Sequence, residues 1–174
     1  RIPQGIPSKQ AIEMTAWSEE APLYGGAISC DIPRSFSDAS TFREVPDHQE
    51  VWVDTSSDRS LVVEILEQKE VTDEEAISFF LSDLASFNEA VDPSVLQSRR
   101  LADEEVPHIS ARSFCGLGEQ TVAKFKEARG NRVRIHAAVL RLEKQQTDIL
   151  ITFNDPVSID PESSSADAPI AEGA

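Results

Sequence analysis

Residues 60–88 decide the fold, because they place an apolar strand directly before an amphipathic helix: SLVVEILEQKEVTDEEAISFFLSDLASFN. The segment Ser60–Leu66 is apolar on both faces, which is typical of a strand in the middle of a sheet. Thr72 and Glu75 have the spacing of a capping box, which marks the start of a helix. The apolar residues after them recur at helical spacing and predict one buried stripe that ends at Asn88. Its members are Ala76, Ile77, Phe80, Leu81, Leu84 and Phe87.

Strand patterns precede this strand and helix. Tyr24–Ile32 fits a strand, and the Gly25-Gly26 pair within it predicts a bulge or a close backbone approach. Glu50–Asp54 alternates apolar residues and fits a second strand, followed by a short polar turn.

The second half of the chain also favours sheet. Val133–Leu142 and Asp148–Asn154 read as two strands joined by a short polar loop, which is the pattern of a hairpin. Gly116–Phe125 fits another strand, although Val122–Arg129 could also be helical. Three strands, one helix and three further strands predict an α+β domain with a largely antiparallel sheet.

Composition divides the 174 residues into one domain and two ends. Residues 1–21 form an N-terminal extension, with a short helix expected over Ala11–Trp17. Residues 22–156 form the folded domain. Residues 157–174 are acidic, rich in Ser and Pro, and are expected to be a tail or linker.

The chain is strongly acidic, with 31 acidic and 16 basic side chains and a net charge of −15. A nucleic-acid partner or an anionic lipid surface requires a basic patch, so neither is expected. The longest apolar runs are strand-sized, so no membrane insertion is expected. A basic protein partner suits this charge, although acidity that only maintains solubility is the simpler alternative.

Acidic residues gather in two groups. The first, between the first two predicted strands, contains Asp38, Glu44, Asp47 and Glu50, with Arg43 among them. The second begins at Glu64 and extends to Glu75. Glu64 interrupts an otherwise apolar central strand, so its charge requires either solvent or a partner. Because side chains alternate along a strand, Glu64 and Glu67 share one surface only if the strand ends, twists or bulges near Leu66.

Signals for an enzyme are weak. His48, His108 and His136 do not have the spacing of metal ligands. Cys115 has no neighbour in sequence that would lower its pKa and make it a nucleophile. No phosphate-binding glycine motif is present. We therefore expect no catalytic residues, no metal and no cofactor.

The most specific signal is a resemblance to the Ran guanine nucleotide release factors, the Mog-type Ran-binding proteins of nuclear import. It covers roughly residues 22–156. The blocks that carry it are PLYGGAI (22–28), DAS (38–40), REVPDHQEVW (43–52), SLVVEILE (60–67), LRL (140–142) and QTDILITFN (146–154).

The resemblance implies a PsbP-like α/β/α sandwich, in which a six-stranded, mainly antiparallel sheet has helices on both faces. It implies a protein of the nucleus and cytoplasm that binds the small GTPase Ran, promotes nucleotide release and supports nuclear protein import. The family's Ran-contacting surface would comprise Asp38, Arg43, Asp47, Glu50, Glu64 and Glu67.

Three other functions are compatible with parts of the sequence. A trafficking adaptor could use the same acidic surface to recruit a transport partner without affecting nucleotide exchange. A photosynthetic PsbP-like role would rest on the fold alone, and the Ran-type blocks argue against it. An enzyme has the least support.

Overall fold

The structure is a computed structural model that describes residues 17–107, 109–122 and 130–159. The chain forms two compact units, residues 1–37 and residues 38–174, and each is described by itself. The expected helix at Ala11–Trp17 lies outside the described residues except for Trp17. No helix among the described residues has both the length and the apolar character needed to cross a membrane.

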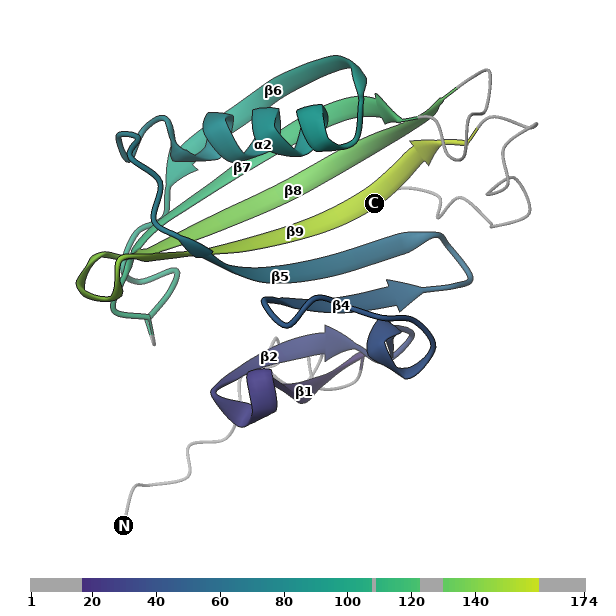
Figure 1. Cartoon of the computed structure of the whole chain (residues 1–174), viewed down its shortest axis with the longest axis horizontal. Helices are drawn as coiled ribbons and strands as arrows, with labels where there is room; N and C mark the ends of the chain where they lie inside the picture. The colour runs from purple at the N-terminus through teal and green to yellow at the C-terminus, as the bar shows by residue number, and fades with distance from the viewer. Residues whose placement is uncertain (1–16, 108, 123–129, 160–174) are drawn as a thin grey trace. The chain divides into compact units, whose positions relative to one another are not determined.

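The first unit contains an antiparallel hairpin of β1 (Ser18–Leu23) and β2 (Ile28–Pro33), shown in purple in Figure 1. The 3-10 turn η1 (Tyr24–Gly26) joins the two strands. Its three residues have positive φ angles, 66° at Gly25 and 92° at Gly26, which an extended strand cannot contain. The prediction of one strand over Tyr24–Ile32 is therefore wrong: the glycine pair forms the hairpin turn.

The second unit contains a sheet whose strand order is β3-β4-β5-β9-β8-β7-β6, and neighbouring strands from β4 to β6 pair antiparallel (Figure 1). The strands are β3 (Ser37–Asp38), β4 (Gln49–Asp54), β5 (Arg59–Glu67), β6 (Val91–Arg100), β7 (Arg112–Val122), β8 (Asn131–Leu142) and β9 (Thr147–Ser158). The prediction of a mainly antiparallel α+β fold is confirmed.

The expected count of six strands differs from the seven in this sheet. The first predicted strand belongs to the separate hairpin, whereas β3 and β6 were not predicted. All ten residues of β6 are exposed, so its sequence lacks the alternation of apolar and polar residues that marks a half-buried strand.

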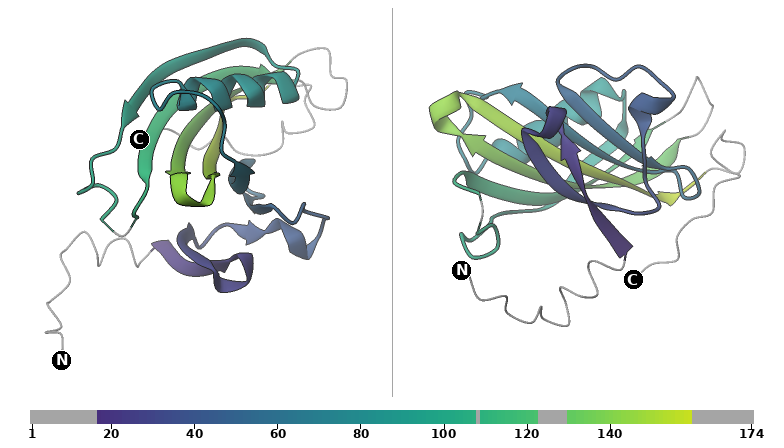
Figure 2. Two further views of the ribbon diagram at one scale, coloured as in Figure 1. Left: turned by 60° about the vertical axis from the view of Figure 1, so that its left-hand side comes forward. Right: turned by 90° about the horizontal axis from the view of Figure 1, so that it is seen from below.

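The helix α2 (Ala76–Phe87) packs against one face of the sheet, as the left-hand view of Figure 2 shows. We call this the helix face; Phe114 of β7, Val139 of β8 and Leu150 of β9 lie on it in one row. Gly116 allows the helix to approach closely. A Cβ atom at Gly116 would collide with the side chain of Ile77 and lie 2.7 Å from a backbone oxygen of β6.

The C-terminal end of α2 follows the predicted signal, but its N-cap is Glu75 and not Thr72. The Thr72 N–H donates to the Glu75 carboxylate at 3.2 Å, as in one half of a capping box, and the regular helix begins at Ala76. Asn88 is the C-cap, as predicted. The prediction that Phe87 is buried is wrong, because this side chain is 84% exposed. Among the described elements α2 is the one α-helix, so helices on the opposite face stay a prediction.

Two segment boundaries also differ from the sequence prediction. β9 runs to Ser158, so Val157 and Ser158 belong to the strand and not to the tail. β7 begins at Arg112 and ends at Val122. Residues 123–129, which could have been strand or helix, lie outside the described residues.

A buried ion network fixes the connection between β5 and α2. Arg141, which is 5% exposed, donates to Asp148 at 3.2 Å, to Asp73 at 3.0 Å and to the carbonyl oxygens of Lys69 and Val71. The Lys69 N–H in turn donates to Asp148 at 3.0 Å. Asp73, from the second acidic group, therefore has a structural role.

An exposed ion pair closes the connection between β6 and β7. Both terminal nitrogens of Arg99 donate to Glu105 at 2.8 Å, and the Ala102 N–H adds a third hydrogen bond at 2.9 Å. The hydrogen bonds from Arg99, and next that from Ala102, lower the pKa of Glu105 from 4.5 to about 2.

We expect Arg99→Gln to raise the pKa of Glu105 toward 4.5, as measured by an NMR titration of the side-chain carboxyl group. Because the pKa is lowered in the folded protein, the stability that the pair contributes is present above about pH 4.5 and is lost as the pH falls toward 2. A Glu105 that titrates near 4.5 in the unmodified protein would contradict this assignment.

Candidate partner-binding site

Three of the predicted carboxylates lie at the same end of the β4–β5 pair. Asp47 is in the turn that leads into β4, and the His48 carbonyl oxygen accepts the Ile65 N–H at 2.9 Å. Glu64 is directly opposite Gln49 in the register, and Glu50 is opposite Val63. The fold thus brings Asp47, Glu50 and Glu64 together from two segments of the sequence.

The carboxylates nevertheless point to different faces of the sheet. Glu64 is in register with Leu150, so it lies on the helix face, whereas Glu50 lies on the opposite face with Val63. The pairing of β5 with β9 continues without a bulge to Glu67, which is therefore on the face opposite Glu64. No bulge near Leu66 brings Glu64 and Glu67 to one surface.

Asp38 and Arg43 flank the short 3-10 helix η2 (Ala39–Thr41). The Ser40 N–H donates to the Asp38 carboxylate at 2.8 Å, so Asp38 caps this helix. The Arg43 side chain is exposed, lines a groove on the helix face and forms no ion pair within the described residues. Structural capping thus accounts for Asp38, while Arg43 is placed near Glu64.

The groove beside Glu64 has a volume of about 490 Å³. Its apolar lining comes from β4, β5, β9 and α2 and includes Val51, Val62, Leu66, Leu84, Phe87 and Leu150. The polar lining includes Glu64, Gln49, Arg43, His48 and Asp83. The main core under α2 is formed mainly by β7, β8 and β9. The groove lies beside this core, on the part of the helix face that includes β4 and β5.

Gln49 orients Glu64 in this groove. Its amide nitrogen donates to one carboxylate oxygen of Glu64 at 2.6 Å, and both side chains are half-buried. Sequence reasoning did not select Gln49, because its role depends on the register between β4 and β5. The charge within an apolar strand was enough to find Glu64 itself.

The other side chains that could ligate a metal or act as nucleophiles lie apart from this groove or outside the described residues. Among residues 17–107, 109–122 and 130–159, no group of three or more His, Cys, Asp and Glu side chains is placed to hold a metal ion. His136 is exposed on β8 with its ring beside Phe153, and His108 lies outside the described residues. Cys30 and Cys115 are free thiols.

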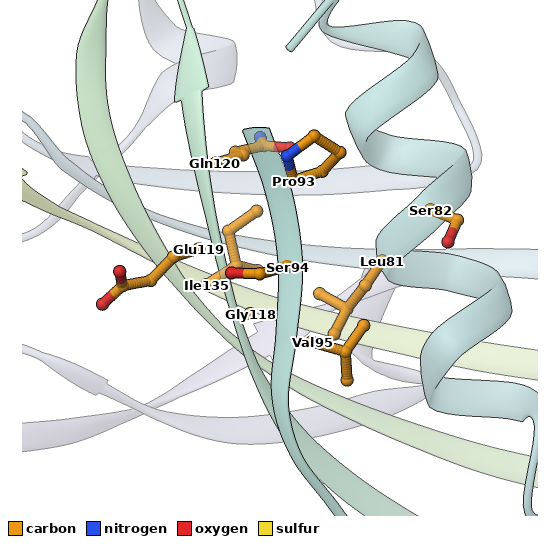
Figure 3. A pocket seen from close by; sticks show the side chains of 9 residues that line it. All are labelled: Leu81, Ser82, Pro93, Ser94, Val95, Gly118, Glu119, Gln120 and Ile135. Carbon is orange, nitrogen blue, oxygen red and sulfur yellow. The ribbon is translucent and has the colours of Figure 1, made fainter. Parts of the chain in front are cut away.

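A second cavity lies between α2 and the β6–β7 pair, but it is small. Its volume is about 70 Å³, and Figure 3 shows Leu81 of α2 and Val95 of β6 next to each other in its lining, with the Glu119 side chain directed away. Glu119 instead binds Arg132 and Arg134, and the hydrogen bond from Arg134 is the largest cause that lowers its pKa. This cavity is too small for a ligand of drug size.

Comparison with known proteins agrees with this architecture. Residues 21–156 match the model of the Ran-interacting Mog1 protein family. The chain is 40% identical to a probable Ran guanine nucleotide release factor of Dictyostelium discoideum, over 87% of this chain and 80% of that protein. It is 33% identical to the nuclear import protein MOG1 of Saccharomyces cerevisiae, over 81% of this chain and 67% of that protein.

Solved structures give the same result. The crystal structure of the Saccharomyces cerevisiae Ran-binding protein Mog1p has a TM-score of 0.64 and 32% identity, covering 81% of this chain and 78% of that one. A Mog1 variant with one glutamate replaced by alanine has a TM-score of 0.66 and 31% identity, covering 86% and 82%. The matched region holds the β4–β5 carboxylates and the groove, and the chain belongs to the Mog1 family of Ran-interacting proteins.

Proposed function

We propose that this protein binds Ran, promotes the release of its guanine nucleotide and thereby supports nuclear protein import. Its membership of the Mog1 family supports this proposal, as do the names of its relatives, which are release factors and nuclear import proteins. A protein with this function would act in the nucleus and the cytoplasm. Of the predicted surface, the proposed Ran contact centres on Asp47 and Glu64, whereas Glu50 and Glu67 lie on the opposite face of the sheet from Glu64.

The observation that carries the proposal is the placement of negative charge at the end of the β4–β5 pair. Asp47 is exposed, and Glu64 accepts its hydrogen bond from a neutral amide. Neither carboxylate has a cationic partner within the described residues. Charges that are left uncompensated in this way suit a basic surface on another protein.

Such a regulator needs no covalent chemistry and no cofactor. Nucleotide release is promoted if the protein binds nucleotide-free Ran more tightly than nucleotide-bound Ran, because the two ligands then weaken each other's binding. The protein's own contribution is the shape and charge of the contact surface. We therefore propose a non-catalytic regulator.

We expect Asp47→Lys to weaken Ran binding by about tenfold, because an exposed charge at a contact mainly changes the association rate and its salt dependence. The measurement is the release of a fluorescent nucleotide from purified Ran at increasing concentrations of the regulator. Glu104→Lys is the matched control, since Glu104 is exposed between β6 and β7, at the opposite edge of the sheet.

The control should behave like the unmodified protein, although it makes the same change in net charge. Equal losses in both variants would mean that net charge, and not this site, determines binding. Tight binding to Ran without faster nucleotide release would refute the exchange activity and favour an adaptor.

A further inference from the structure

We propose that the groove between α2 and the β4–β5 pair receives one long basic side chain of Ran. Its aliphatic stem would pack against Leu84 and Phe87, and its charged head would bind Glu64. This inference rests on the proposed function, since it takes Ran as the partner.

The apolar wall of the groove is left accessible by the part of the chain that the structure describes. Phe80, Leu84 and Phe87 follow one another at helical spacing along α2, and all three line the groove. Phe80 is buried in the core, but Phe87 is 84% exposed at the end of the helix. An aromatic side chain exposed beside half-buried aliphatic ones is typical of a binding surface.

Glu64 gives the groove its charge. The side chain is half-buried among Val62, Leu66 and Leu150, and its one hydrogen bond within the described residues comes from the Gln49 amide. A carboxylate in apolar surroundings is costly unless a cation compensates it. The continuous β5–β9 register fixes it on this face.

The remaining charged groups of the groove carry both signs. Asp83 contributes a second carboxylate from the exposed side of α2. Arg43 and His48 also line the groove, from the segment before β4, and Arg43 forms no ion pair with Glu64. The Glu64 carboxylate accepts its hydrogen bond from a neutral amide, so its negative charge is available to an incoming cation.

The same features disfavour other occupants. A second copy of this chain would bring another net charge of −15, and a phosphate group would meet Glu64 directly. A wholly apolar side chain would bury Glu64 without compensation. Lys and Arg combine an apolar stem with a charged head, which is the pairing that an aromatic wall beside a carboxylate would recognise.

The test is a double-mutant cycle on Ran binding, measured by calorimetry with the full chain. Glu64→Gln keeps the shape and removes the charge, while Phe87→Ser removes the exposed wall without disturbing the core. We expect each variant to weaken binding by about tenfold, and the double variant to weaken it by clearly less than the product of the two. Leu96→Ser, at an exposed leucine of β6, is the matched control and should bind normally.

Each outcome decides the inference. If Glu64→Gln and Phe87→Ser bind like the unmodified protein while Asp47→Lys is weakened, the groove is not the contact and the proposed function stands. If the double variant loses as much affinity as the product of the two single losses, the wall and the carboxylate do not contact one and the same side chain of Ran. The inference is then overturned. If the unmodified protein does not bind Ran at all, the proposed function itself fails.

Discussion

Replacing Arg141 with methionine is expected to lower the free energy of unfolding by about 3–5 kcal/mol, which is typical when one partner of a buried ion pair is removed. Asp148 is 0% exposed, so its charge would lose the guanidinium at 3.2 Å without gaining water. The carbonyl oxygens of Lys69 and Val71 would lose their donors as well. Urea unfolding followed by circular dichroism measures the change.

Two variants make this prediction specific. Adding Asp148→Asn to Arg141→Met should recover part of the lost stability, because no buried charge is then left unpaired. Arg99→Gln removes an ion pair whose side chains are 57% and 42% exposed, so it should cost much less stability than Arg141→Met. If Arg141→Met costs as little as Arg99→Gln, the buried network does not fix the β5–α2 connection.

The elements that could be predicted are those in which burial shapes the sequence. β5, β8 and β9 lie within the sheet, so β5 and β9 contain nearly continuous apolar runs and β8 has apolar residues at alternate positions. β6 lies at the edge with ten exposed residues and includes Pro93, so neither periodicity nor strand propensity indicates it. β1 escaped prediction because its sequence, SEEAPL, is acidic and contains a proline.

In α2 the predicted periodicity is correct, but the burial predicted from it is wrong at Phe87. Periodicity placed Phe87 on the same side of α2 as Leu84, and both do line the groove. Whether Phe87 is buried depends on which strands the helix covers. The core partners of α2 come mainly from β7, β8 and β9, so the helix end beside β4 and β5 stays exposed. That arrangement is a tertiary property, which a one-dimensional pattern does not contain.

The candidate site was predictable in its parts but not in its assembly. Glu64 stood out as a charge inside an apolar strand, and the alternation of side chains already separated it from Glu67. That Asp47 and Glu64 lie at one end of a strand pair follows from the β4–β5 register. Asp38 carries the same charge, but its carboxylate caps the 3-10 helix η2.

Because Glu64 and Glu67 lie on opposite faces of the sheet, reversing each charge in turn tests which face binds Ran. Glu64→Lys is expected to weaken Ran binding by at least about 30-fold, since reversing a charge at a desolvated contact costs about 2–5 kcal/mol. Glu67→Lys makes the same change three residues along β5, on the opposite face and beyond the start of β4. An exposed charge outside the main contact is worth about 1 kcal/mol or less, so we expect a loss of about fivefold or less.

A titration of both variants against Ran measures this contrast, with circular dichroism to confirm that each is folded. The comparison is well matched, because both positions lie on one strand and both changes alter the net charge equally. A larger loss in Glu67→Lys than in Glu64→Lys would place Ran on the face that carries Glu50 and Val63. Equal, large losses would require a partner that wraps around the open end of the β4–β5 pair, because one flat surface cannot contact side chains on both faces of a continuous strand.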